Sequence, residues 1–234
     1  MIYYDFHIHS ALSPCGDKDM TPNNIVNMAS IIGLDAIAIT DHNSIGNVRA
    51  AIKVGEQVGV KVLAGMEVET AEEIHILTLY KTIEAAEEVA KKVYDALPDI
   101  KNRPEIFGNQ YYMDEEDNVI GEEEKLLISP TTIQVEDLLE MVKSVGGLVF
   151  PAHVDRHSYS ILTNLGFIPE ELAVDGIEIS KKVGDVQTYL NSRPDLKKYS
   201  VLRNSDAHYL TDIAEKDAFI KENSINEMFD RRVR

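Results

Sequence analysis

Residues 3–10 of the chain read YYDFHIHS, which places His7 and His9 one residue apart in a run that is mostly apolar or aromatic. The whole run, residues 2–9, predicts a buried strand. Because residues i and i+2 of a strand face the same side, both imidazoles point to one side of the sheet. The chain has only seven histidines, so two of them on one strand face indicate a site that uses both.

Six more short apolar runs follow, and helical patterns separate most of them. The runs cover residues 36–40, 60–70, 73–80, 146–153, 174–180 and 199–208, and the helical patterns cover residues 21–33, 44–59, 82–97 and 134–147. Strands that alternate with helices indicate an α/β fold with a parallel sheet. The fourth run follows the third too closely for a crossover helix, so that step predicts a sharp bend or an antiparallel pair. We expect a distorted seven-stranded, TIM-like (β/α) barrel.

Residues 98–132 interrupt the alternation of strands and helices. They contain three prolines and two acidic groups, at residues 114–117 and 122–124. We interpret the stretch as an acidic insertion on a single barrel domain that spans residues 1–234. It forms a lid or an oligomer contact, or else a surface hairpin without a role, and the sequence leaves these alternatives open.

The net charge of −17 comes from 40 acidic and 23 basic residues. Such a surface repels polyanions and anionic lipid, which argues against a nucleic-acid partner and favours a small anionic phosphoester at a site where metal ions reverse the field. The single cysteine excludes an internal disulfide, and no apolar run is long enough to span a membrane. Because the first residues also lack a secretion signal, we expect a cytoplasmic protein without a membrane partner; its oligomeric state stays open.

The other candidate site residues lie at the ends of predicted strands or, for one histidine, within a strand. They are Asp41, His42, Glu67, His75, His153, Asp206 and His208. In an α/β barrel, the carboxyl ends of the strands form the rim that carries the chemistry. One histidine at a strand end is usually an ordinary polar residue, but this whole set is hard to explain by packing. Imidazole and carboxylate groups together suit zinc, iron or manganese, so the pattern predicts a centre for divalent metal ions.

These motifs resemble those of the PHP superfamily, named after polymerase and histidinol phosphatase domains. The resemblance rests on DFHIHS, ITDHN, GMEVET, EIHILTLY, PAH and SDAH, which follow one another between residues 5 and 208. It implies a distorted seven-stranded barrel, a trinuclear metal centre and hydrolysis of phosphate esters, and we expect two to three divalent ions in this chain. It also implies three ligand sets, namely His7, His9, Glu67 and Asp206 at the first ion, Glu67, His75 and His153 at the second, and His42 with His208 at the third.

One position departs from the family pattern. Family members usually carry a histidine or an aspartate five or six residues after the HxH pair, where this chain reads SPCG at residues 13–16. We expect Cys15 to be a thiolate ligand, which favours zinc or iron over manganese at that ion. Alternatively, Asp17 or Asp19 completes a weakly held third ion, or Cys15 is an inert turn residue.

The chemistry expected of such a centre is attack by a metal-bound hydroxide, with the metal ions offsetting the charge that builds on the phosphate. Asp41 is the candidate general acid, or else it orients a metal-binding histidine. Arg156 is the candidate clamp for the phosphate. His157 is a weaker candidate acid, and Lys181 and Arg203 are weaker candidate clamps.

The sequence therefore predicts a metal-dependent phosphoesterase that hydrolyses a small phosphate ester. A monoester, such as a nucleotide or a sugar or amino-alcohol phosphate, is placed ahead of a diester. The alternatives are a nuclease or phosphodiesterase that acts on nucleic-acid ends or oligonucleotides, and a non-catalytic metal-binding scaffold. A related hydrolase of C–N bonds would need a strand-end lysine among the ligands, and only Lys181 is a candidate.

Overall fold

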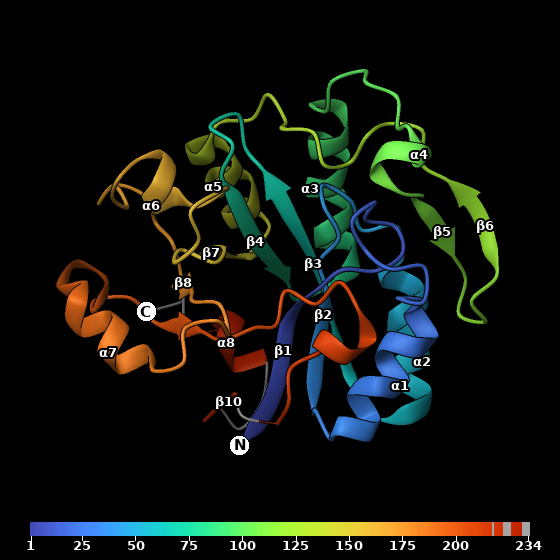
Figure 1. The fold of residues 1–234 in the computed structure, drawn as a ribbon, viewed down its shortest axis with the longest axis horizontal. Coiled ribbons are helices and arrows are strands. Elements are labelled where there is room, and N and C mark those ends of the chain that lie inside the picture. Colours follow the sequence, from blue (N-terminus) through green and yellow to red (C-terminus); the bar gives the residue numbers. More distant parts are fainter. Residues whose placement is uncertain (217, 222–225, 231–234) are drawn as a thin grey trace.

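The computed structural model describes residues 1–216, 218–221 and 226–230, and its centre is a curled sheet of six strands (Figure 1). The strand order is β10-β1-β2-β3-β4-β7. The strands are β1 (Ile2–Ile8), β2 (Ala36–Ile39), β3 (Lys61–Glu69), β4 (His75–Tyr80), β7 (Leu148–Pro151) and β10 (Phe219–Ile220). Strand β10, which pairs antiparallel with β1, was not among the predicted strands.

The last two predicted strands are much shorter than expected. Strands β8 (Ile177–Glu178) and β9 (Val201–Leu202) form a separate parallel ribbon. Their ladder pairs only Ile177 with Val201 and Glu178 with Leu202, and just beyond it the Ser180 backbone N–H donates to the Asp155 carboxylate at 2.7 Å. The fold is therefore α/β with a curled, half-barrel sheet, and the predicted seven-stranded barrel is not confirmed.

The direction of β4 places its first residue at the edge of the sheet that carries the site. Strands β1, β2 and β3 are parallel, whereas β4 is antiparallel to both β3 and β7. This confirms the antiparallel alternative for the step between the third and fourth strands. As a result, His75 at the start of β4 pairs with Glu69 at the end of β3.

The four predicted helices are present and cover one face of the sheet. They are α1 (Pro22–Ile32), α2 (Val48–Val58), α3 (Ile83–Asp95) and α5 (Val135–Ser144). Thr21 caps α1 as expected, because its hydroxyl accepts the Asn24 N–H at 3.2 Å. Helix α2 begins later than the pattern suggested, since the chain turns at Gly46 and Asn47.

Several short helices complete the described chain. They are α4 (Pro104–Phe107), α6 (Ile161–Asn164), α7 (Val186–Ser192) and α8 (Asn226–Asp230), with 3-10 turns η1 (Pro194–Leu196) and η2 (Leu210–Asp212). Within the described residues, every helix is too short or too polar to cross a lipid bilayer.

Both faces of the sheet are apolar, which explains the nearly continuous apolar runs in the sequence. One face packs against the four long helices through side chains such as Ile37, Val62 and Ile76. The other face forms a second cluster inside the curl, with Tyr4, Phe6, Leu63, Leu77, Leu79 and Phe150 among its buried members. Because residues alternate along a strand, Glu67 lies on the same face of β3 as Leu63, at the carboxyl end of this inner cluster.

The insertion at residues 98–132 is held against the loops that precede α1 and α2. It contains α4 and the hairpin of β5 (Tyr111–Met113) and β6 (Val119–Glu122), which lies beside α2 in Figure 1. The buried Asn47 side chain donates to the carbonyl of Tyr111 at 3.0 Å and accepts the backbone N–H of Met113 at 2.8 Å. The Thr21 hydroxyl donates to Asp117 at 2.6 Å. Hydrogen bonds thus fix the insertion to the loops before α1 and α2. Its role as a lid or an oligomer contact stays a prediction.

Candidate metal centre

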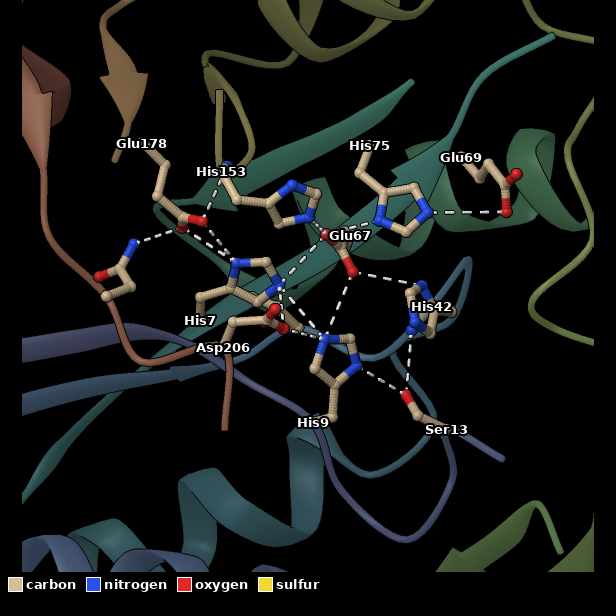
Figure 2. Close-up of polar contacts among 12 residues, drawn as sticks. His7, His9, Ser13, His42, Glu67, Glu69, His75, His153, Glu178 and Asp206 are labelled. Atoms are coloured by element: carbon tan, nitrogen blue, oxygen red, sulfur yellow. Dashed lines mark hydrogen bonds and ion pairs between the residues drawn. The ribbon is translucent and has the colours of Figure 1, made fainter. Parts of the chain in front are cut away.

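Glu67 is the central group of the site, and it is almost fully buried. Five imidazole nitrogens lie within 3.3 Å of its two oxygens. Figure 2 shows these imidazoles arranged around Glu67. They are His7 Nε2 (3.3 Å), His9 Nε2 (3.3 Å), His42 Nδ1 (3.2 Å), His75 Nδ1 (3.0 Å) and His153 Nε2 (3.2 Å). One carboxylate offers about four lone-pair sites, so it cannot accept a good hydrogen bond from each of five nitrogens. Five nitrogens are too many for hydrogen bonds to one carboxylate, whereas nitrogens and oxygens grouped in this way suit the coordination of cations.

His7 and His9 reach Glu67 from β1, as the spacing of the two residues predicted. The pairing of β1 with β2 shifts register between Asp5 and Ile8. This β-bulge interrupts the regular alternation of side chains at that point of the strand. Both imidazoles are fully buried, and their Nε2 atoms lie 3.2 Å apart. Asp206 Oδ1 is 3.1 Å from His9 Nε2. Two imidazole nitrogens at this distance share one hydrogen bond at most, so a common cation satisfies them better.

The hydrogen bonds of Asp41 set the orientation of His9. Asp41 is buried and accepts from the Ser10 N–H (2.7 Å), the Ser10 hydroxyl (2.6 Å) and the Ser13 hydroxyl (2.6 Å). The Ser13 oxygen therefore accepts from His9 Nδ1, at 3.0 Å, and leaves the lone pair of His9 on Nε2. Asp41 does not line the cavity. Of the two roles considered for it, this placement favours orienting a metal-binding histidine over donating a proton.

Two more histidines are held in the same tautomer. His7 Nδ1 lies 2.9 Å from Glu178, and His208 Nδ1 lies 2.8 Å from the backbone carbonyl of Asp206. A carboxylate and a carbonyl only accept hydrogen bonds, so both Nδ1 atoms carry a proton, and Nε2 is the atom that would offer its lone pair to a cation once any proton on it is displaced. Hydrogen bonds of this kind typically orient metal-binding histidines.

Three buried imidazole nitrogens lack a hydrogen-bond partner among the described residues. They are the Nδ1 atoms of His42, His75 and His153. The first two lie close to Glu67 but without the alignment of a hydrogen bond. An unpaired buried polar atom costs about 1–3 kcal/mol. Since metal coordination would remove this cost at several positions together, the donor set fits divalent ions.

The described residues contain three groups whose ligand atoms lie within 4.8 Å of one another. The groups are His7, His9, Glu67 and Asp206; His42, Glu67 and His75; and His9, Cys15, His42 and His208. The first group is the set that the family resemblance implied for the first ion. The second contains His42 in place of His153, although His153 Nε2 lies 3.2 Å from Glu67. The structure thus brings all the predicted histidines, Glu67 and Asp206 together.

Cys15 joins His9, His42 and His208 in the third group. Cys15 is exposed as a residue, but the protein packed around its sulfur and the charges of Glu67 and Asp206 raise the pKa of the thiol, so it stays protonated until a cation is present. Asp17 and Asp19 belong to none of the three groups found in the described residues. The structure thus places Cys15 within reach of three candidate histidine ligands, and its role as a thiolate ligand stays a prediction.

Electrostatics prepare the cluster for cations. Burial alone would raise the pKa of Glu67, but the charges of His75 and His7 outweigh it and hold that pKa well below its usual range. Burial, followed by the charge of His9, lowers the pKa of His208 to about 4. Burial likewise holds the pKa of His42 well below its usual value. Glu67 is therefore ionised at neutral pH, and His42 and His208 are neutral bases, as metal ligands must be.

The cluster opens into a cavity of about 310 Å³. Its lining includes Cys15, His42, Glu67, His75, His153, Arg156, Tyr159, Asp206 and His208. Arg156 Nη2 lies 2.6 Å from Asp206 Oδ2. The buried Nε of Arg156 has no hydrogen-bond partner among the described residues. His157 is exposed and does not line the cavity. Of the candidate phosphate clamps, Arg156 is the one that the structure places in the cavity wall.

The backbone around the cavity adopts conformations that favour glycine. His153 (φ 30°), Tyr159 (φ 54°) and Asp206 (φ 53°) all have positive φ. Such residues cost about 1–3 kcal/mol each and persist where the surrounding structure holds them, often at functional sites. The strain thus coincides with two of the candidate ligands.

Sequence reasoning missed Glu178, which is fully buried behind the cluster. It accepts from His7 Nδ1 (2.9 Å), the His153 backbone N–H (3.0 Å) and Asn204 Nδ2 (2.8 Å). The signal available was a carboxylate between two isoleucines in a predicted buried strand. Lys181, the candidate for a C–N hydrolase, belongs to none of the metal-binding groups, and its ammonium donates to the Asp212 carbonyl.

Comparison with known protein families gives one match that covers most of the chain. The sequence model described as PHP domain matches residues 5–157, which is more than half of the chain. The matched stretch contains His7, His9, His42, Glu67, His75 and His153.

Two relatives of named activity match over shorter stretches. A phosphoribosyl 1,2-cyclic phosphate 1,2-diphosphodiesterase from Eggerthella lenta is 34% identical over 80 residues, which are 32% of this chain and 29% of that protein. A 5'-3' exoribonuclease from Haemophilus influenzae is 33% identical over 79 residues, which are 32% of this chain and 28% of that protein. The matches thus span less than a third of either relative.

The structure of a lesion-specific endonuclease Q from Pyrococcus furiosus shares the fold. Its TM-score is 0.71 at 19% identity, and the likeness covers 98% of this chain and 55% of that chain. A structure of endonuclease Q with a 27-mer duplex that carries an abasic lesion has a TM-score of 0.64, at 19% identity over 89% of this chain and 49% of that one.

These comparisons correct the prediction about nucleic acid. A net charge of −17 was taken to argue against a nucleic-acid partner, but one sequence relative is an exoribonuclease and a protein of the same fold acts on DNA. The argument was wrong because net charge averages over the whole surface, whereas the field at a metal centre is set by the ions and the nearest side chains.

Proposed function

The chain belongs to the PHP family, and from this we propose that it is a metal-dependent phosphodiesterase whose metal centre forms around Glu67. The observation that carries the proposal is the arrangement of five imidazole nitrogens within 3.3 Å of one buried carboxylate. Asp206 and Cys15 extend this set to three overlapping groups of ligand atoms.

A diester is favoured over the monoester expected from the sequence. Both relatives of named activity are named for cleavage of phosphodiesters, one in a cyclic phosphate and one in RNA. The comparisons give the preference for a monoester no support. Since one of the two relatives of named activity is an exoribonuclease, oligonucleotides are a second candidate class of substrate beside small phosphodiesters.

The residues divide into those that bind cations and those that act on the substrate. His7, His9, Cys15, His42, Glu67, His75, His153, Asp206 and His208 are the proposed ligands of two to three zinc, iron or manganese ions. Ions bound there supply a nucleophile at neutral pH and neutralise charge on the phosphate. Arg156 offers an unpaired buried N–H at the cavity wall, where a phosphate oxygen would accept it. Asp41 positions His9 through Ser13.

The first experiment measures metal content and activity on the same protein. Protein purified without added metal or chelator is analysed by elemental mass spectrometry and then assayed with bis-p-nitrophenyl phosphate, p-nitrophenyl phosphate and a short RNA. We expect about two to three ions per chain, hydrolysis of the diester faster than of the monoester, and loss of hydrolysis in Glu67→Gln. The exposed Glu171→Gln is the matched control and retains activity.

Other outcomes would change the proposal in defined ways. A metal-loaded protein that hydrolyses only the monoester is a phosphatase, and one that hydrolyses none of the three substrates supports the scaffold. A protein that binds none of the three metals after reconstitution would overturn the metal centre itself.

A further inference from the structure

Three basic side chains surround a second cavity, separate from the metal centre. Lys181, Lys182 and Arg203 line a space of about 440 Å³ that shares no lining residue with the metal cavity. We call it the basic cavity. Lys181 and Arg203 were only weak candidates for a catalytic clamp, and the structure places them here together. Such a concentration of positive charge is unusual in a chain with a net charge of −17.

The charges around the basic cavity are largely uncompensated. The Lys181 ammonium donates to the Asp212 carbonyl, and Arg203 Nη1 donates to the Val183 carbonyl at 2.6 Å. Within residues 1–216, 218–221 and 226–230, none of the three bases forms an ion pair with a carboxylate, although Glu215 also lines the cavity. A carbonyl oxygen orients a cation without cancelling its charge, so the lining carries three positive charges against the single carboxylate of Glu215.

The floor of the basic cavity is rigid and connected to the metal centre. Asn204, which lines the cavity, is almost fully buried. Its Oδ1 accepts the Phe6 backbone N–H at 2.9 Å, and its Nδ2 donates to Glu178 at 2.8 Å. Glu178 in turn holds His7. A ligand seated on this floor would therefore contact the same hydrogen-bonded chain that orients a proposed metal ligand.

We propose that the basic cavity binds a small anion that carries phosphate groups, of the size of pyrophosphate or a mononucleotide. Its volume lies in the range of ordinary small-molecule sites, and clustered Lys and Arg side chains suit phosphate oxygens through charge-assisted hydrogen bonds. The anion is either a phosphate of the substrate next to the one being cleaved or a separate effector. Binding itself does not depend on the proposed activity.

The test is titration of pyrophosphate into chelator-treated protein by isothermal calorimetry, because bound metal ions would themselves bind pyrophosphate. We expect Lys181→Gln/Lys182→Gln to weaken binding by about tenfold or more. The matched control is Lys91→Gln/Lys92→Gln on α3. It removes two exposed lysines that are distant in sequence from the basic cavity and leaves binding unchanged. Thermal melting checks that each variant folds. If the lysine variant fails to fold, Arg203→Gln against Arg203→Lys tests the same charge.

A kinetic measurement on the metal-loaded enzyme distinguishes the two sources of the anion. It records how pyrophosphate inhibits the hydrolysis of bis-p-nitrophenyl phosphate. An effector changes kcat in the wild type and not in Lys181→Gln/Lys182→Gln. If the cavity instead binds a neighbouring phosphate of the substrate, Lys181→Gln/Lys182→Gln has a higher KM than the wild type, but only for substrates that carry a second phosphate. Equal pyrophosphate binding in the wild type and the variant, or an equal loss in the control, would overturn the proposal.

Discussion

Glu178 lies 2.9 Å from Nδ1 of His7, while Nε2 on the opposite side of the same imidazole lies 3.3 Å from Glu67. Glu178 also accepts the backbone N–H of His153 at 3.0 Å, so one buried carboxylate fixes two candidate ligands from different strands. Burial alone would raise the pKa of Glu178, but the charge of His7 and its hydrogen bond outweigh it and lower the pKa. Glu178 is therefore an ionised acceptor that keeps the proton of His7 on Nδ1.

Glu178→Gln is expected to weaken metal binding by about 10–100-fold without removing a ligand. The amide keeps the size of the side chain but loses the charge that selects the tautomer of His7. Competition with a chromogenic chelator measures the affinity, and Glu171→Gln is the exposed control. Unchanged affinity in Glu178→Gln would mean that Glu178 contributes only to packing.

Asp41→Asn separates the two roles considered for Asp41. Three short hydrogen bonds reach this buried carboxylate, so the loss of its charge is expected to cost about 1.5–3 kcal/mol, or roughly 5–10 °C in melting temperature. The alkaline limb of the pH–rate profile should remain, because the carboxylate does not line the cavity. A stable, metal-loaded variant that loses this limb would instead identify Asp41 as the general acid.

Most of the site was predictable because its residues lie beside apolar runs. His7 and His9 share a strand face, and Asp41, Glu67, His153 and Asp206 come at or near the ends of strands whose pattern is plain in the sequence. The family resemblance added the grouping of these ligands, which the structure reproduces for the first ion. Glu178 was missed because it interrupts a buried strand and its partners are distant in sequence.

The architecture was less predictable where long-range hydrogen bonds decide it. Just past β8, the Ser180 N–H donates to the Asp155 carboxylate, an interaction across 25 positions that no local pattern indicates. Strand β10 joins β1 from the other end of the chain. Both explain why a curled six-stranded sheet stands in place of the expected seven-stranded barrel.

Metal binding is expected to stabilise the fold. The unpaired Nδ1 atoms of His42 and His75 face Glu67, where a bound cation would satisfy them. A ligand at about 100 times its Kd adds about 2.7 kcal/mol, which corresponds to a rise of roughly 5–10 °C in melting temperature. Thermal melts of chelator-treated protein with and without manganese or zinc measure this rise. In Glu67→Gln it should shrink strongly, and an equal rise there would place the ions elsewhere.

Metal affinity is expected to increase with pH through the neutral range. Burial alone would lower the pKa of His75, but the negative charge of Glu67, whose Oε1 lies 3.0 Å from His75 Nδ1, and that of nearby Glu69 outweigh it and raise the pKa to about 9. Without metal, His75 therefore keeps a proton at neutral pH, and a cation must displace it. The apparent Kd for manganese should fall as pH rises and level off above about pH 9. His75→Gln should flatten the dependence, and His157→Gln, which alters an exposed histidine, should not.

Cys15 is the position where this chain departs from its family, and cobalt reports directly on its role. If the thiol binds the third ion with His9, His42 and His208, cobalt-loaded protein shows a thiolate-to-metal charge-transfer band in the near ultraviolet. Cys15→Ser should abolish the band, and Cys15→Asp should restore the third ion with a harder ligand and shift preference toward manganese. Because the raised pKa keeps the free thiol protonated, cobalt binding should also release a proton that Cys15→Ser does not release. A band that persists in Cys15→Ser cannot come from a thiolate in a chain with one cysteine, and it would reduce Cys15 to a turn residue.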